Sequence, residues 1–287
     1  MRRLVSWILF PSLFVISIGG AIWALEGGAS GGRVIAGVSI ACIAVVALTE
    51  RLVPFRREWN RTQGDLATDS AYLPITAGVN AAIEPGVKVA GAMAGTALAA
   101  ALGIGLWPAH WPLLGQLALA CVIAEFFDYW AHRVMHENEW LWRFHAIHHS
   151  APRLYWLNAT RAHPGEMLFR GTIGMLPMSI LGADQAVFIM LAVVNVSVGL
   201  FQHANIDFKL GPLSWVFSVG ELHRWHHSTV VAEANRNYGN NFMFWDAVFG
   251  TRFLPSDRHC PAELGIGTPF PPNLVAQLAA PFQWNSR

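Results

Sequence analysis

Long apolar runs separated by short polar segments dominate this chain, and several runs are long enough to cross a membrane. Residues 4–24 contain no charged side chain, and residues 34–49 form a second uncharged run after the Gly/Ser-rich turn at 27–32. A helix of about 20 apolar residues spans the ~30 Å hydrocarbon core of a bilayer. The pattern therefore predicts a helical hairpin that crosses the membrane twice.

The start of the chain also fits a secretory signal peptide, because basic residues precede the apolar run. The run is longer than the apolar region of such a peptide, and LEGGASGG at 25–32 contains no convincing cleavage site. We therefore expect a retained span. Basic residues flank the outer ends of both spans, which places those ends in the cytoplasm. They are Arg2, Arg3, Arg51, Arg56, Arg57 and Arg61.

The next part of the chain predicts two more spans. Residues 57–88 are more polar, and we expect a short helix and a loop on the cytoplasmic surface. A Gly/Ala-rich run at 89–107 would cross outward, PAHWP at 108–112 would turn, and 113–130 would return. Small residues at close spacing allow tight packing of helices in lipid.

A further apolar stretch at 168–201 is interrupted by Pro177 and by Gly182-Ala183-Asp184. This pattern predicts two shorter membrane segments or a re-entrant hairpin, entered and left from the cytoplasm. Residues 203–287 have mixed polarity and predict a cytoplasmic cap. The expected fold is all-α: a membrane protein of about four spans plus a helical hairpin, with a cytosolic helical cap.

Composition agrees with this fold and excludes several functions. Hydrophobic residues make up 54% and charged residues 13% of the chain, against about 25% charged residues in soluble domains. The net charge of +1 gives no electrostatic basis for binding nucleic acid. Cys42, Cys121 and Cys260 are widely separated and form no CxxC pattern, so neither a disulfide framework nor a thiolate metal site is indicated.

Histidines form three clusters with helical spacing, and these are the strongest functional signal. One is an HxxxH pair and two have the form HxxHH, so each cluster can direct imidazoles from one helical face into one pocket. Eight ligands exceed the need of one ion and indicate a polyhistidine site for two metals. Imidazole suits several transition metals, so spacing alone does not select one. The clusters are His132 and His136; His145, His148 and His149; and His223, His226 and His227.

Carboxylates and amides near the clusters are candidates for orienting the ligands. Asp128 lies one helical turn before His132 and could accept a hydrogen bond from the far nitrogen of that ring. Glu125, a turn earlier, could instead be a buried hydrogen-bonding residue. Asn241 and Asp246 follow the third cluster and could also support a ligand.

These motifs together resemble the fatty acid hydroxylase/sterol desaturase superfamily of membrane di-iron enzymes. The similarity rests on HRVMH, HAIHH and HRWHH in this order, with an apolar hairpin between the second and third. Flanking segments add to it: DYWAHR, NATRAHPGE at 158–166, QHAN at 202–205 and NYGNNFMFWDAVFGTRF at 237–253. The resemblance divides the chain into N-terminal spans and a surface loop (1–109), a catalytic domain (110–255) and a cytosolic tail (256–287).

The resemblance implies two iron ions that use O₂ to hydroxylate a C–H bond of a membrane lipid. It makes the eight clustered histidines ligands and adds His203 as a ninth. Fatty acid hydroxylases have another histidine four residues earlier, where this chain has Gly199, so the tenth ligand is open. His163, in an HPxE element like that of sterol-oxidising members, is a possible ligand. Zinc can replace iron in such sites during preparation.

Electrons are expected to come from a separate carrier, a ferredoxin or a cytochrome b5-type protein with its reductase. The chain has no GxGxxG motif after a strand and no ferredoxin-like cysteine run, so we expect no flavin or haem in it. The expected location is a bacterial inner membrane, with the site facing the cytoplasm.

Three alternatives remain from the sequence. The same site could desaturate a lipid, since hydroxylation and desaturation both begin by removing hydrogen. A membrane metal transporter or metal-binding protein could use the histidines for transit, although the first two spans carry no ionisable residue. A zinc-bound hydrolase or an inactive relative is the third. Lipid identity, regiochemistry and oligomeric state stay open.

Overall fold

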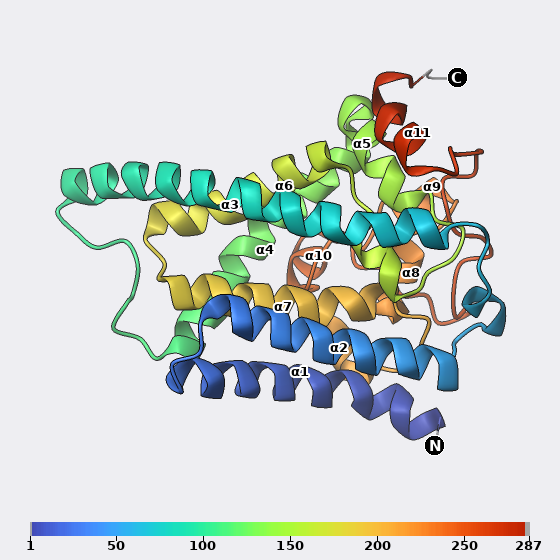
Figure 1. The fold of residues 1–287 in the computed structure, drawn as a ribbon, viewed down its shortest axis with the longest axis horizontal. Coiled ribbons are helices and arrows are strands. Elements are labelled where there is room, and N and C mark those ends of the chain that lie inside the picture. The colour runs from blue at the N-terminus through green and yellow to red at the C-terminus, as the bar shows by residue number, and fades with distance from the viewer. Residues whose placement is uncertain (1, 285–287) are drawn as a thin grey trace.

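The computed structural model describes residues 2–284, and its regular elements within that range are helices (Figure 1). Five of the described helices, α1 to α4 and α7, are long and apolar enough to cross a membrane. The prediction of an all-α, multi-span membrane protein is confirmed. The long helices are α1 (Arg2–Glu26), α2 (Gly31–Leu52), α3 (Leu66–Leu102), α4 (Leu113–Glu137), α5 (Glu139–His149), α6 (Pro164–Leu181) and α7 (Gln185–His203).

The long helices form two layers that α4 joins (Figure 1). In one layer α3 packs along α6, and in the other α7 packs against α1 and α2. Helix α4 crosses between the layers and contacts both α6 and α7. The outward faces of α1 to α3 expose large apolar side chains, among them Val15, Ile40 and Met93. Such faces suit lipid.

Small residues bring α3 and α6 into close contact. A Cβ atom at Gly91 would lie 2.3 Å from the Ser179 Cβ, and one at Gly95 would lie 2.1 Å from the Ile180 carbonyl oxygen. The two glycines are four residues apart and therefore share one face of α3. The predicted role of small residues in close helix packing is confirmed at this crossing.

The predicted hairpin over 168–201 is present as α6 and α7. Helix α6 ends at Leu181, and Gly182 adopts a left-handed conformation with φ 80° that only glycine takes readily. Helix α7 starts three residues later and returns to the end of the molecule where α6 began (Figure 1). His203 is its last residue, so the hairpin returns this side chain to the histidine clusters.

The prediction that residues 57–107 divide into a surface segment and a separate span is wrong. Instead of a surface loop over 57–88 and a span over 89–107, a 37-residue helix, α3, runs from Leu66 to Leu102. Such a helix is ~55 Å long and exceeds the ~30 Å hydrocarbon core. Its polar first turns therefore extend alongside the cap, where Asp69 is fully buried. The polar residues before position 89 therefore mark the part of α3 that extends beyond the membrane, and they do not mark the end of a helix.

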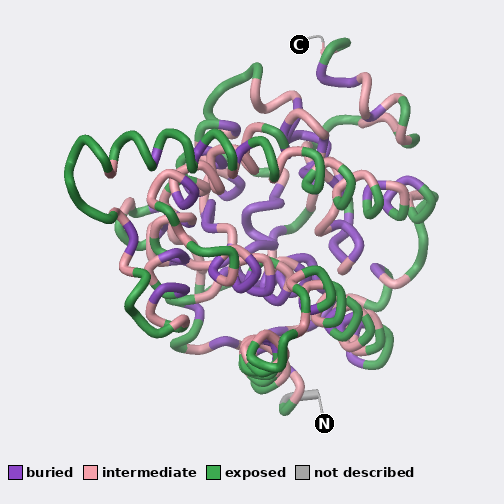
Figure 2. The backbone as a smooth tube through the Cα atoms, turned by 60° about the vertical axis from the view of Figure 1, so that its left-hand side comes forward, coloured by how far each residue is buried: buried purple, intermediate pink, exposed green. Residues whose placement is uncertain are grey.

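The cap places most of its short helices at the end of the molecule where α2 ends and α3 begins, while α10 lies nearer the middle, against α4 (Figure 1). Buried backbone is concentrated in the interior, and exposed backbone follows the outer helices (Figure 2). The cap elements are α8 (Gly220–His226), α9 (Val231–Ala234), α10 (Phe244–Val248) and α11 (Leu274–Ala279), with the 3₁₀ turns η1 (Arg57–Asn60), η2 (Trp156–Thr160), η3 (Gly211–Trp215) and η4 (Ala280–Phe282).

Candidate metal centre and active site

A sharp corner between α4 and α5 brings the first two histidine clusters together. Helix α4 ends at Glu137, and the Asn138 side chain accepts hydrogen bonds from the backbone N–H groups of Trp140 and Leu141, each at 3.0 Å. Asn138 thus caps the start of α5, as asparagine does well. Because α5 turns back at once, its HxxHH face lies against the HxxxH pair of α4.

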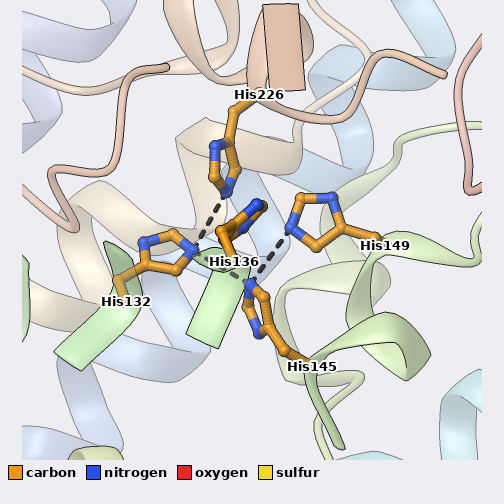
Figure 3. A group of neighbouring side chains, drawn as sticks. All are labelled: His132, His136, His145, His149 and His226. Atoms are coloured by element: carbon orange, nitrogen blue, oxygen red, sulfur yellow. Dashed lines mark hydrogen bonds between the residues drawn. The ribbon is translucent and has the colours of Figure 1, made fainter. Parts of the chain in front are cut away.

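Five histidines from three helices form the first group, which we call the five-histidine group (Figure 3). His132 Nε2 lies 2.9 Å from His145 Nε2 and 3.0 Å from His226 Nε2. His149 Nε2 lies 3.1 Å from His145 Nε2. The His136 ring completes the group, 4.7 Å from the His149 ring between centroids. The members are His132, His136, His145, His149 and His226.

The second group, the four-histidine group, contains His148, His203, His223 and His227. His203 Nε2 lies 3.3 Å from the Nε2 atoms of both His148 and His223. The Nε2 atoms of His223 and His227 are 3.0 Å apart. The two groups adjoin, since the rings of His149 and His227 stack at 4.4 Å between centroids.

The donor sets fit transition-metal ions. Two imidazole nitrogens bound to one ion at ~2.1 Å lie about 3.0 Å apart at right angles and about 3.4 Å apart at the tetrahedral angle. The Nε2 separations of 2.9 to 3.3 Å match these edges. Each group could therefore hold one ion through neutral imidazoles, and the pair could hold two.

Burial keeps the histidines of α5 and α8, and His227 just after α8, in the neutral form that binds metal. Desolvation lowers the pKa of His145, His149 and His227 well below the usual 6.5, and it lowers the pKa of His226 to about 3. Neighbouring imidazoles add to the effect, because a second positive charge beside a first is unfavourable. At neutral pH these rings carry lone pairs without needing to lose a proton.

Backbone carbonyls set the orientation of three rings. His132 Nδ1 lies 2.7 Å from the Tyr238 carbonyl oxygen, and His226 Nδ1 lies 2.8 Å from that of Arg236. His148 Nδ1 lies 3.1 Å from the carbonyl oxygen of Arg161. A carbonyl only accepts, so Nδ1 carries the proton and Nε2 presents its lone pair to the group.

A carboxylate does lie behind one of the clustered histidines, but it is Glu166 behind His145, which the sequence analysis did not predict. Glu166 Oε1 accepts from His145 Nδ1 at 2.8 Å, and both side chains are buried. A carboxylate in this position fixes the ring and increases its basicity. Glu166 is the last residue of the HPGE element, whose histidine, His163, is the residue that the resemblance suggests as a ligand.

The proposed contact between Asp128 and His132 is not what the structure has. Asp128 instead accepts two hydrogen bonds from Arg170 of α6, from Nε at 3.0 Å and from Nη2 at 2.6 Å. Arg170 also approaches Glu166, at 3.7 Å. Helical spacing correctly places Asp128 on the same face of α4 as His132. However, Arg170 from α6 pairs with Asp128, and the Tyr238 carbonyl oxygen lies behind His132 instead.

Asp246 holds a turn beside the five-histidine group, whereas Asn241 is bound to Glu125. Asp246 accepts from the backbone N–H groups of Tyr238 and Gly239 at 2.8 and 2.7 Å, which holds the turn whose carbonyl faces His132. Asn241 donates from Nδ2 to Glu125 Oε1 at 2.6 Å. Neither side chain contacts a histidine ring directly through a hydrogen bond among residues 2–284.

His163 lies outside both groups. Its Nδ1 accepts from the Gly165 N–H at 2.8 Å, which caps the start of α6, and its Nε2 lies 3.2 Å from the Leu278 carbonyl oxygen. Both ring nitrogens therefore have local partners. The structure gives His163 a capping role at the start of α6 and does not bring it into either histidine group.

The start of α3 holds the loop behind His148, a contact that no sequence pattern predicts. Asp69 accepts from Arg161 Nη1 at 2.9 Å and from Tyr155 and Asn158 at 2.8 Å. Arg161 is the residue whose carbonyl faces His148. The buried ion pair between Asp69 and Arg161 therefore links α3 to the four-histidine group.

Fold and site together define a membrane protein with paired polyhistidine groups at one end of its spans. The family model for fatty acid hydroxylase matches residues 117–251. The ornithine lipid hydroxylase OlsE of Rhizobium tropici is 39% identical over 260 residues, covering 87% of this chain and 76% of that protein. This chain belongs to the fatty acid hydroxylase family, and it is an oxygenase-type oxidoreductase.

More distant relatives match about half of this chain. Methylsterol monooxygenase 2-2 of Arabidopsis thaliana is 27% identical over 139 residues, 47% of this chain and 52% of that protein. The very-long-chain aldehyde decarbonylase GL1-11 of Oryza sativa subsp. indica is 27% identical over 146 residues, which cover 50% of this chain and 54% of that protein. The chain thus spans about half the length of these two relatives. No solved structure matches it.

Proposed function

We propose that this enzyme uses two iron ions and O₂ to hydroxylate a C–H bond of an amino-acid-bearing membrane lipid such as an ornithine lipid. The observation that carries the proposal is the meeting of nine histidine side chains in two adjoining groups at the end of the spans. The relative with 39% identity is an ornithine lipid hydroxylase, which favours that lipid class.

The chain's residues would contribute binding, orientation and protection from water. When bound, the two irons would supply the activation of O₂ for attack on a C–H bond. The buried imidazoles would hold them, His145 with the support of Glu166. The surrounding apolar helices would exclude water and admit a substrate from the bilayer.

The proposal also covers the side of the membrane that the cap faces and the source of electrons for the metal centre. The segment that follows α2 lies beside the cap, since the Arg56 N–H donates to Asn205 Oδ1 at 2.9 Å, two residues after His203. This segment is rich in arginine, which favours the cytoplasmic side of a bacterial inner membrane. An external ferredoxin or cytochrome b5-type carrier would then reach the cap from the cytoplasm.

Lipid analysis in a bacterial host that makes ornithine lipid tests this function. We expect expression of the chain under ¹⁸O₂ to add one labelled oxygen atom to that lipid, and tandem mass spectrometry to locate it in the head group or an acyl chain. His149→Ala should abolish the product, whereas His110→Ala, an exposed histidine in the turn before α4, should retain it. Loss of hydrogen without added oxygen would indicate desaturation, and an unchanged lipid profile would contradict the proposal.

A further inference from the structure

The two histidine groups are unequal, although they share one ligand type. The first brings five imidazoles together and the second four. His203 is the one ligand of the four-histidine group that comes from a membrane-spanning helix, and it is the last residue of α7. The face of α7 that leads to His203 therefore connects the smaller group to the membrane-spanning part of the protein.

Gly199 lies one helical turn before His203 on that face. A Cβ atom built at Gly199 would meet no described atom within 4 Å apart from its chain neighbours and the nearby backbone of its own helix. Side chains of a helix lean toward its N-terminus, so the His203 ring extends over the turn that contains Gly199. In agreement, His203 Nδ1 lies 3.5 Å from the Gly199 carbonyl oxygen. Open space thus adjoins the four-histidine group on the side of Gly199.

The corresponding positions on the other helices carry side chains. One turn before His132 is Asp128, which pairs with Arg170. Four residues before His223 is Val219, which immediately precedes α8 and is fully buried. The open position beside His203 is therefore a local property of α7.

The open face continues along α7 toward the bilayer. Asn195 lies a further turn before Gly199, and burial increases along this row: Asn195 is exposed, Gly199 is half-buried and His203 is buried. Asn195 is polar within a candidate span, and its Oδ1 accepts from Asn241 Nδ2 at 2.6 Å. Polar residues inside spans commonly line functional paths.

We propose that the four-histidine group is the position that accepts an exogenous ligand, and that the row Asn195, Gly199 and His203 forms the approach to it. Catalytic metal sites keep an open position, whereas closed shells are structural. The assignment of the approach to a lipid rests on the proposed function. The assignment of the ligand position does not, because it follows from the donor sets, which give the four-histidine group one imidazole fewer than the five-histidine group.

Two substitutions at Gly199 test the ligand position and the lipid approach separately. The probe is azide, and its binding is measured by the cobalt(II) absorption of the full-length protein loaded with cobalt. Gly199→His offers a further imidazole, and we expect azide affinity to fall by about tenfold or more while two metals stay bound. Gly199→Leu fills the space without a ligand atom. It should keep azide affinity within about twofold and reduce lipid hydroxylation by about tenfold or more. Gly37→His, at an equally open glycine on α2, is the matched control and should change neither quantity.

Unchanged azide affinity in Gly199→His would overturn the ligand position, and so would an equal loss in Gly199→His and Gly199→Leu. Full lipid hydroxylation by Gly199→Leu would overturn the approach along α7. The azide comparison requires no lipid, so it decides the ligand position even if the wild-type chain modifies no ornithine lipid, a result that would contradict the proposed function alone.

Discussion

The five-histidine group and the four-histidine group differ in how firmly the protein holds their rings. In the first, His132, His145 and His226 each have an oxygen acceptor at Nδ1 within 2.8 Å. In the second, the buried Nδ1 atoms of His223 and His227 have no hydrogen-bond partner among residues 2–284. Hydrogen bonds at the far nitrogen orient a ligand and increase its basicity. The comparison indicates one preorganised site and one adaptable site.

The largest expected effect comes from a ring at the contact between the groups. His149→Ala removes a ligand of the five-histidine group that stacks on His227 of the other. We expect loss of at least one metal per chain and of all lipid hydroxylation, measured by metal analysis and lipid mass spectrometry. His110→Ala provides the control, and full metal content in His149→Ala would contradict the assignment of ligands.

Removing the carboxylate behind His145 tests the preorganised site. Glu166→Ala leaves the His145 Nδ1 without its acceptor, and we expect metal affinity of the five-histidine group to fall about 10- to 100-fold. Glu166→Gln keeps an acceptor oxygen without the charge and should fall between wild type and alanine. Titration with a competing chelator measures both. Equal affinities in all three proteins would show that Glu166 does not support the site.

Chelation of the wild-type protein compares the groups directly. Because the four-histidine group has one donor fewer and two unpartnered Nδ1 atoms, we expect it to lose its ion first. A stepwise loss, with affinities about tenfold apart, is the expected result. Simultaneous loss of both ions would argue against a difference in preorganisation.

A smaller effect is expected from the start of α3. Asp69→Asn removes the charge that holds Arg161, the residue behind His148. A hydrogen bond contributes about 0.5–1.5 kcal/mol, so the four-histidine group should bind metal about three- to tenfold more weakly. The five-histidine group serves as the internal reference in the same chelator titration. Weakening of both groups alike would indicate a general loss of fold.

Local spacing explains how much of the centre the sequence could predict. HxxxH and HxxHH each place imidazoles on one helical face, so the clusters could be identified before the fold was known. His203 entered through the resemblance, because a single histidine at the end of an apolar run carries no spacing signal. The structure brings these nine side chains together, and metal ligation by them is the prediction that the experiments above test.

Contacts between segments that are far apart in the chain explain which features of the site and of α3 could not be predicted from the sequence. Glu166 meets His145 only because α6 returns beside α5, and Asp128 pairs with Arg170 for the same reason. The long helix α3 was divided wrongly because its polar first turns contact the cap instead of water. The spans, the hairpin and the close packing of small residues followed from hydropathy and glycine spacing, which are local properties.

The position of bound iron tests the central claim most directly. An experimental structure of anaerobically prepared, iron-loaded protein, with anomalous scattering measured at the iron edge, should show two ions. One should lie among His132, His136, His145, His149 and His226, and the other among His148, His203, His223 and His227. A single ion, or an ion bound by His163, would contradict the account.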